Sequence, residues 1–349
     1  MSKEEGHYVT LPEQQLETKL YNFEITFDST LFLLTSSSLK GDNELAVVEI
    51  LKGQKTPKVY SCSTDVILAN CKVFPIFGKL FLCGFGYESA SKIGKESIYF
   101  CQEFDINTRH EFKVKINGKP WKENIVDLDF IDDSVFFACE YQLCKYSLGE
   151  MKMEMIFEQS EKKPSGKFRK IQTDRKNRRI YVTRKNQIQV FDDTWKVVST
   201  IDQAHELPIR SIDLNPNKQH QILSAAGEPF LKFWDLRNAS QPNLVFNDPS
   251  GLVTSASFNK TYDQLILYGT DNGSLGLYCA NNVSSAVVLR PPDEPLPDNV
   301  IVHTYRSALD DCVDSLSWSY QDPWIFGAFA RNKGYFDFPP QHKRLDVMY

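Results

Sequence analysis

Residues 205–238 read HELPIRSIDLNPNKQHQILSAAGEPFLKFWDLRN, and this stretch decides the fold of the chain. Its three short apolar runs, 209–214, 221–225 and 230–235, are separated by an Asn-Pro-Asn segment and a Gly-Glu-Pro segment. Proline fixes its φ angle and glycine accepts a positive one, so both segments favour turns. The last run alternates apolar with other side chains, the period of a strand. The stretch therefore predicts three successive β-strands joined by turns.

A histidine near the start of this stretch and Trp234-Asp235 near its end are the signature of a WD40 propeller blade. One blade cannot bury its own apolar faces, so the remainder of the chain should repeat it. Similar strand pairs do recur at intervals of about 40 to 50 residues, the period of four-stranded blades. They predict seven blades, at residues 20–60, 61–110, 120–150, 160–200, 205–246, 250–290 and 305–340.

We therefore expect an all-β, seven-bladed WD40 β-propeller that forms a single domain over residues 1–349. Its ring should be closed by an N-terminal strand that pairs into the last blade, because closure hides the strand edges. Either His7–Leu11 or Leu16–Phe23 can supply that strand, and the sequence does not choose between them. The 42% apolar content, with 13% aromatic residues, is sufficient to fill a large core.

Charge and composition exclude several classes of protein. The formal net charge of −5 argues against nucleic-acid binding, which requires an excess of basic side chains. The N-terminal residues MSKEEGHYVT lack the apolar region of a signal peptide, and no apolar run approaches the roughly 18 residues of a membrane span. The eight cysteines include no Cys-x-x-Cys pair, so we expect eight free thiols in a reducing compartment. These features predict a cytoplasmic protein.

Residues 215–242, NPNKQHQILSAAGEPFLKFWDLRNASQP, resemble the WD40 proteins that interact with the EARP and GARP vesicle-tethering complexes. The resemblance continues through 262–267, 297–301, 313–319 and the Asp-Pro-Trp-Ile-Phe segment at 322–326. It is good over roughly residues 205–330 and poor from about 55 to 200, so the chain is identified as a divergent member of this family.

The resemblance implies a non-enzymatic scaffold whose partners are subunits of the EARP and GARP complexes. It implies roles in endosomal recycling, endosome-to-Golgi retrograde transport and the sorting of dense-core vesicle cargo. The protein would then be cytoplasmic, and peripheral at the trans-Golgi network and recycling endosomes. Its membrane association would be indirect, through the tether. We expect no cofactor, no metal and no small-molecule substrate.

In the WD40 fold, a histidine, a serine or threonine, a turn aspartate and the tryptophan form a buried hydrogen-bond network within a blade. Here the candidates for this structural network are His205, Ser224, Glu228 (where an aspartate is expected), Trp234 and Asp235. The candidate partner contacts are polar residues expected on exposed parts of the later blades: Arg210, Lys218, Arg237 and Asp322.

Two other functions compete with the scaffold. Trp234-Asp-Leu-Arg237 fits the WDxR pattern of substrate receptors for a cullin ubiquitin ligase, in which an exposed arginine docks on the adaptor. We expect Arg237 instead to pair with an aspartate of a neighbouring blade. The second competitor is an enzyme, because the methylesterase of diphthamide synthesis is a WD40 protein. However, the six histidines show no metal-ligand spacing, and the Asp pairs at 132–133, 192–193 and 310–311 are expected in turns.

Eleven Lys and Arg residues lie between Lys162 and Lys185. Such a basic segment can bind an acidic protein or phosphoinositide headgroups, but it can equally be a solvated blade edge. We favour the second interpretation, with the run Arg175–Arg179 as the tip of a hairpin.

Overall fold

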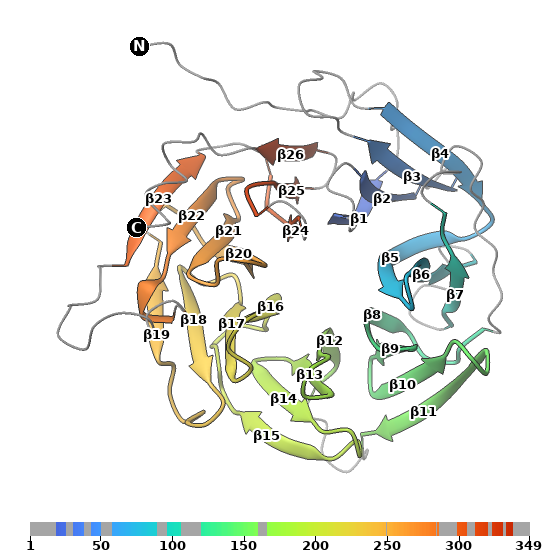
Figure 1. Ribbon diagram of the computed structural model, residues 1–349, viewed down its shortest axis with the longest axis horizontal. Helices are drawn as coiled ribbons and strands as arrows, with labels where there is room; N and C mark the ends of the chain where they lie inside the picture. The colour runs from blue at the N-terminus through green and yellow to red at the C-terminus, as the bar shows by residue number, and fades with distance from the viewer. Residues whose placement is uncertain are drawn as a thin grey trace. The chain divides into compact units, whose positions relative to one another are not determined.

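The computed structural model shows a protein built almost entirely of antiparallel β-strands (Figure 1). The structure describes residues 19–25, 31–37, 43–49, 58–88, 96–105, 120–159, 166–248, 250–283, 285, 299–305, 311–319, 323–330 and 333–337. Within these ranges the one helix is a short 3-10 turn, η3 (Asn281–Val283). No helix in the described part of the chain has the length and apolar character needed to cross a bilayer. The all-β class predicted from the sequence is confirmed.

The described residues divide into two compact units, one up to Ile209 and the other from Arg210 onward. The first unit contains four sheets. Their strands are β1 (Lys19–Ile25), β2 (Leu31–Ser37), β3 (Asn43–Glu49) and β4 (Lys58–Thr64); β5 (Ile67–Ile76), β6 (Lys79–Tyr87) and β7 (Ile98–Glu103); β8 (Ile125–Ile131), β9 (Ser134–Cys139), β10 (Gln142–Ser147) and β11 (Lys152–Glu158); and β12 (Phe168–Asp174), β13 (Arg179–Arg184), β14 (Gln187–Phe191) and β15 (Val197–Ile201).

The second unit contains three sheets. Their strands are β16 (Ser211–Leu214), β17 (Gln221–Ala225), β18 (Phe230–Asp235) and β19 (Leu244–Asn247); β20 (Val253–Phe258), β21 (Leu265–Thr270), β22 (Leu275–Cys279) and β23 (Val300–Tyr305); and β24 (Ser315–Trp318), β25 (Phe326–Ala330) and β26 (Lys333–Asp337). The three apolar runs at 209–214, 221–225 and 230–235 contain β16, β17 and β18.

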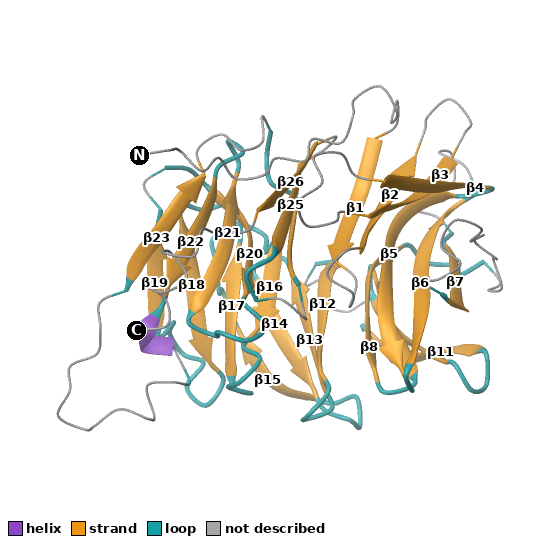
Figure 2. Ribbon diagram, turned by 45° about the horizontal axis from the view of Figure 1, so that its top comes forward, coloured by secondary structure: helices purple, strands orange, loops and turns teal. Residues whose placement is uncertain are grey.

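Every sheet is an antiparallel meander in which strand order follows chain order, because short hairpins join consecutive strands. Within a unit, the first strands of successive sheets lie next to one another: β5, β8 and β12 in one unit, and β16, β20 and β24 in the other. Figure 2 shows that the loops and turns lie at the ends of the strands, so hairpin tips from neighbouring sheets gather at common ends of a unit.

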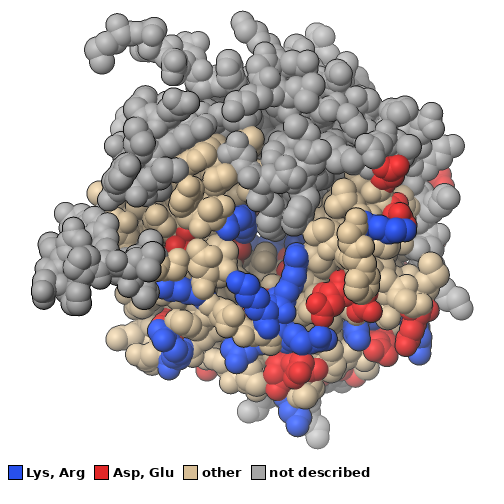
Figure 3. All heavy atoms as spheres, in the orientation of Figure 1, with Lys and Arg blue, Asp and Glu red and all other residues tan. Residues whose placement is uncertain are grey.

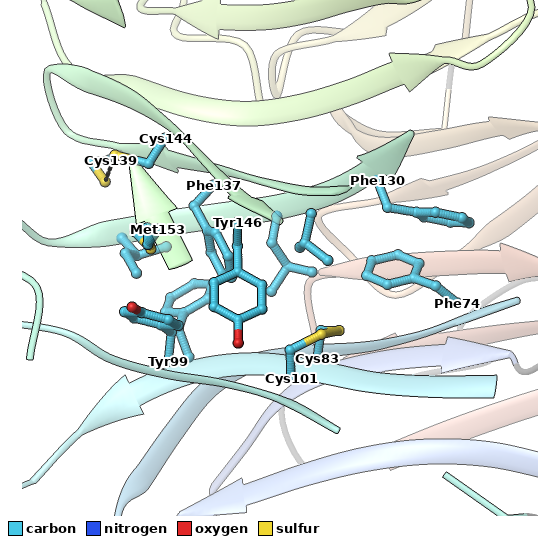
Figure 4. Packing of buried hydrophobic residues seen from close by; sticks show 14 of the residues in the cluster. Phe74, Cys83, Tyr99, Cys101, Phe130, Phe137, Cys139, Cys144, Tyr146 and Met153 are labelled. Atoms are coloured by element: carbon cyan, nitrogen blue, oxygen red, sulfur yellow. Dashed lines mark hydrogen bonds between the residues drawn. A yellow bond between two sulfur atoms is a disulfide. The ribbon is translucent and has the colours of Figure 1, made fainter. Parts of the chain in front are cut away.

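Neighbouring sheets bury their faces against each other, and this explains why one sheet alone would be unstable. All six residues of β9, and all six of β21, are buried, so both faces of these strands are covered. Between the sheet of β5 and the sheet of β8, the rings of Phe74 and Phe130 lie 4.1 Å apart between centroids, and Tyr99 packs on Phe137 and Tyr146 (Figure 4). Close-packed layers of this kind make each sheet depend on its neighbours.

Two expectations from the sequence need correction. Cys83 and Cys101 form a disulfide (Figure 4), so the expectation of eight free thiols is wrong for this pair. The cause is register: the two residues face each other directly across β6 and β7, with Cα atoms 4.1 Å apart, a relation that spacing along the chain does not reveal. The other six cysteines are free.

The second correction concerns the strand that closes the ring. Residues 19–23 of the candidate Leu16–Phe23 belong to β1, which pairs with β2 inside the first sheet. The alternative, His7–Leu11, lies outside the described residues. A closed ring of seven blades forming one domain over residues 1–349 therefore stays a prediction.

Candidate functional site

The indole of Trp234 and the hydroxyl of Ser224 form a buried hydrogen bond between β18 and β17. The indole Nε1 donates to the Ser224 Oγ at 2.9 Å, and both side chains are buried. Strand pairing explains the approach, since Trp234 lies opposite Ile222, two residues before Ser224. Two of the five predicted network residues are thus in contact.

The other three network candidates are His205, Glu228 and Asp235, whose place in the network stays a prediction. His205 is buried in the first unit. Glu228 is buried in the turn before β18, where its carbonyl accepts a hydrogen bond from the Val253 amide at 2.7 Å. Asp235 ends β18 and pairs with Arg237 at 2.6 Å. The hydrogen bond from Arg237 lowers the pKa of the Asp235 carboxyl below its ordinary value.

Three of the four candidate partner contacts, Arg210, Lys218 and Arg237, lie in described parts of the second unit. The side chain of Arg237 is 70% exposed, but its guanidinium binds both oxygens of Asp235. The expected pairing with an aspartate of a neighbouring sheet is therefore wrong, because an aspartate two residues earlier lies within reach. Arg210 is exposed with its Nη1 3.7 Å from the Sγ of Cys312, and Lys218 is half-buried in the turn after β16. Asp322 lies outside the described residues.

A set of aspartates that was not predicted from the sequence joins neighbouring sheets. Asp127 of β8 accepts hydrogen bonds from the side-chain amide of Asn70 in β5, at 3.0 Å, and from the backbone amide of Ile171 in β12, at 3.1 Å. One carboxylate thus links three sheets of the first unit. Asp129, two residues further on, accepts bonds from the amide and hydroxyl of Thr173 at 2.7 and 3.1 Å.

Asp213 repeats this arrangement in the second unit. Its Oδ2 accepts hydrogen bonds from the Ser257 hydroxyl at 2.7 Å and the Phe258 amide at 2.9 Å, and it pairs with the Lys260 ammonium at 3.1 Å. These links join residues 44 to 47 positions apart, and the Asp127 and Asp129 links to β12 join residues 44 apart. The signal that the sequence does contain is an aspartate inside an apolar strand. A buried aspartate is rare unless its carboxylate is paired.

Burial affects the titration of one of these carboxyls. Desolvation raises the pKa of Asp129 above its ordinary value, although the nearby charges of Lys72 and Arg175 act in the opposite direction. A carboxylate that is expensive to desolvate at a sheet-to-sheet contact indicates a structural role, because its compensating hydrogen bonds come from Phe130 of its own strand and Thr173 of the adjoining strand.

The basic segment forms a hairpin, in agreement with the favoured interpretation. Residues 175–178 connect β12 to β13, and Asp174 closes the turn by accepting bonds from the backbone amides of Lys176 and Asn177 at 3.0 and 3.2 Å. Figure 3 shows lysine and arginine side chains gathered over the region where β12 and β13 lie in Figure 1. Residues 162–165 of the segment lie outside the described residues.

The Asp pairs occupy turns, as expected. Asp132-Asp133 joins β8 to β9, Asp192-Asp193 joins β14 to β15, and Asp311 precedes β24, while Asp310 lies outside the described residues. The hydroxyl of Thr194 lowers the pKa of Asp192 by donating to its carboxylate. In the described ranges, no three His, Cys, Asp or Glu side chains group closely enough to hold a metal ion.

Two hollows of the first unit are lined by residues that the structure describes. One, of about 880 Å³, lies beside β11 and is lined by residues that include Trp121, Met151 and Met153. The other, of about 600 Å³, lies among the hairpin tips that follow β5, β8 and β12. Both are hollows at which another molecule could be held.

Repeated antiparallel meanders, packed face to face and joined by buried carboxylates, define an all-β protein of the WD40 β-propeller class. Consistent with this class, the chain is 29% identical to a WD repeat-containing protein, DWA2, of Arabidopsis thaliana. The similarity extends over 155 residues, which are 43% of this chain and 43% of the relative. No protein-family model matches the sequence.

More specific similarities connect the chain to a group of interaction proteins. It is 32% identical over 147 residues to EARP and GARP complex-interacting protein 1 of Homo sapiens, covering 37% of this chain and 38% of the relative. It is 30% identical over 141 residues to EARP-interacting protein 1 of Caenorhabditis elegans, covering 37% and 38%. The chain spans between 35% and 39% of the length of the primate and rat relatives that it matches. It is a divergent relative of the EARP and GARP complex-interacting proteins, and the resemblance inferred from its sequence is confirmed.

Proposed function

We propose that the protein is a non-enzymatic WD40 scaffold that binds the EARP and GARP vesicle-tethering complexes. The observation that carries this proposal is the 30–33% identity to proteins that are named for interaction with these complexes. Through the tether it would act in endosomal recycling, retrograde transport to the Golgi and dense-core vesicle cargo sorting. It would be cytoplasmic and peripheral at the trans-Golgi network and recycling endosomes.

The architecture supports such a role in physical terms. Sheets that are fixed to their neighbours by buried carboxylates hold the connecting loops in defined positions, as with Asp127 and Asp213. A rigid frame lowers the conformational entropy that the loops would lose on binding a partner, so more of the contact energy appears as affinity. Arg210, Lys218, Arg237 and Asp322 remain our candidate contacts within the region of resemblance.

The decisive experiment is capture of the tagged full chain from cell lysate with mass spectrometry, followed by binding of the purified chain to purified tether. Recovery of tether subunits and direct binding are the expected results. Binding that fails with purified components would overturn the scaffold assignment. A cullin adaptor in the eluate, lost in an Arg237→Ala variant, would instead establish the ubiquitin-ligase alternative. Loss of diphthamide in a deletion strain would establish the methylesterase alternative.

A further inference from the structure

Phe77 occupies an unusual position at the tip of the hairpin between β5 and β6. It is 85% exposed, more than any other large apolar side chain among the described residues. Its φ angle is +49° and that of Gly78 is +76°, the left-handed pair of a two-residue hairpin turn between Ile76 and Lys79. Such turns favour Asn-Gly, and a bulky residue rarely adopts this conformation. Neither solvation nor the local backbone therefore explains a phenylalanine here, which points to a binding role.

The tips of two neighbouring hairpins complete a hollow beside Phe77. We call it the tip hollow; its lining residues are Pro75, Ile76, Phe77, Phe130, Asp132, Asp133, Arg175 and Arg178, and its volume is about 600 Å³. The Phe130 ring is fixed, because it packs on Phe74 in the core between two sheets (Figure 4). The tip hollow therefore combines a rigid aromatic wall with an exposed aromatic ring, the type of surface that anchors interface side chains.

The charges around the tip hollow favour an acidic ligand. The three tips, residues 75–79, 131–134 and 174–179, contain five Lys or Arg and three Asp. The acids are largely engaged: Asp132 pairs with Arg178 at 2.9 Å, and Asp174 accepts hydrogen bonds from its own turn. Two of the bases are engaged as well, because Lys79 pairs with Glu103 at 2.8 Å and Arg178 with Asp132. Of the two arginines that line the hollow, Arg175 is therefore the one left to meet a ligand.

Arg175 is the basic group best placed to bind a carboxylate. Its guanidinium carbon lies 3.7 Å from the centroid of the Phe130 ring, which fixes the guanidinium plane. Asp129 interacts electrostatically with Arg175 and Lys72, but its Oδ2 already accepts two hydrogen bonds from Thr173. No ion pair of Arg175 occurs in the described part of the chain. A stacked guanidinium retains its N–H edge, which binds a carboxylate in a bidentate manner.

We propose that the tip hollow binds a segment of a protein partner in which an acidic residue stands next to an apolar one. The carboxylate binds Arg175, which Phe130 holds in place, and the apolar side chain packs against the exposed ring of Phe77. This inference does not rest on the proposed function, since it is argued from the three hairpin tips alone.

The test uses a displayed library of random octapeptides, selected on the purified full chain. Two variants alter the tip hollow: Phe77→Asn, which suits the turn, and Arg175→Glu. Two matched controls make the same changes elsewhere in the unit. Gln203→Asn alters another exposed turn residue with a positive φ of 51°, and Arg169→Glu reverses an exposed charge on β12. Selected peptides are then synthesised, and their affinities are measured by fluorescence anisotropy.

We expect peptides with adjacent acidic and apolar residues to be enriched, and each tip variant to weaken their binding about tenfold, whereas the controls stay within about twofold. Replacing the peptide carboxylate by an amide should abolish the effect of Arg175→Glu. Enrichment of basic peptides, no enrichment, or equal effects of controls and tip variants would each overturn the proposal. So would binding to phosphatidylcholine vesicles containing phosphatidylserine that depends on Arg175 without any acidic-peptide preference, because the ligand would then be a lipid. The tether experiment is a separate assay, so the two ideas can fail independently.

Discussion

Replacing Asp213 by alanine should destabilise the protein strongly, because one carboxylate satisfies several donors of the adjoining sheet. The Phe258 amide and Ser257 hydroxyl, at 2.9 and 2.7 Å, are buried and would lose their acceptor. Each buried donor left without a partner costs about 1–3 kcal/mol. Lys260 would also lose its counterion, but its side chain is 21% exposed and water can replace part of that interaction. We expect a loss of about 3–5 kcal/mol in the free energy of unfolding.

Two further variants separate the hydrogen bonds from the charge and from general effects of substitution. Asp213→Asn retains one acceptor oxygen for the Phe258 amide while removing the charge that faces Lys260, so it should lose about 2 kcal/mol. Asp193→Ala makes the same chemical change at an exposed turn between β14 and β15, and it should stay within about 0.5 kcal/mol of the parent.

The assay is guanidinium chloride denaturation, followed by tryptophan fluorescence and circular dichroism, with the three variants compared at equal protein concentration. Buried Trp234 and Trp318 report on the second unit, and the Trp318 indole donates to the carbonyl of Ser257, next to the altered contact. A shifted midpoint with an unchanged denaturant slope would indicate lost stability rather than a changed unfolded state. If Asp213→Ala were no more destabilising than Asp193→Ala, the carboxylate would not link the sheets and the reasoning would be refuted.

Three further predictions follow from other contacts. A double-mutant cycle of Trp234→Phe and Ser224→Ala, measured by the same denaturation assay, should give a coupling energy of about 1 kcal/mol for the buried hydrogen bond; a coupling near zero would contradict it. The raised pKa of Asp129 means that, between its unfolded-state and folded-state pKa values, the folded state binds more protons than the unfolded state, so wild-type stability relative to Asp129→Asn should rise as pH falls through that interval; parallel pH profiles would contradict the raised pKa. Phe77→Asn should raise the thermal midpoint, because asparagine tolerates the left-handed turn and the substitution stabilises the hairpin by about 1 kcal/mol; a lower midpoint would mean that Phe77 contributes to folding.

The sequence was sufficient for the all-β class because its signals are local. The Asn-Pro-Asn turn and the alternation through Phe233 and Trp234 each depend on a few adjacent residues, and they predicted β16 to β18 closely. The Ser224 hydroxyl could be assigned to the same network as Trp234 because both positions belong to the repeat. The blade boundaries and the closed ring depend on contacts between distant segments and remain predictions.

The features that were not predicted have one physical cause. They join residues that are distant in the sequence and meet only when two sheets pack or two strands pair. Asp127 lies in an apolar strand, and nothing local to it shows that Ile171 will present a backbone amide. Cys83 and Cys101 are 18 residues apart, and only the pairing of β6 with β7 places them face to face. For Arg237 the error was the opposite one: we expected a distant partner where an adjacent one, Asp235, sufficed.

The aspartates that join the sheets have a consequence for how the chain is made. Translation delivers the N-terminal part first, so Asp127 and Asp129 are synthesised 44 residues before Ile171 and Thr173. The backbone amides of these two residues donate hydrogen bonds to the aspartates. During that interval the side chains of Asp127 and Asp129 depend on water for the hydrogen bonds that Ile171 and Thr173 later supply. A nascent sheet therefore stays open to hydration and reversal until its successor arrives, and a pause in synthesis after β8 or β16 would prolong the stage most exposed to misfolding.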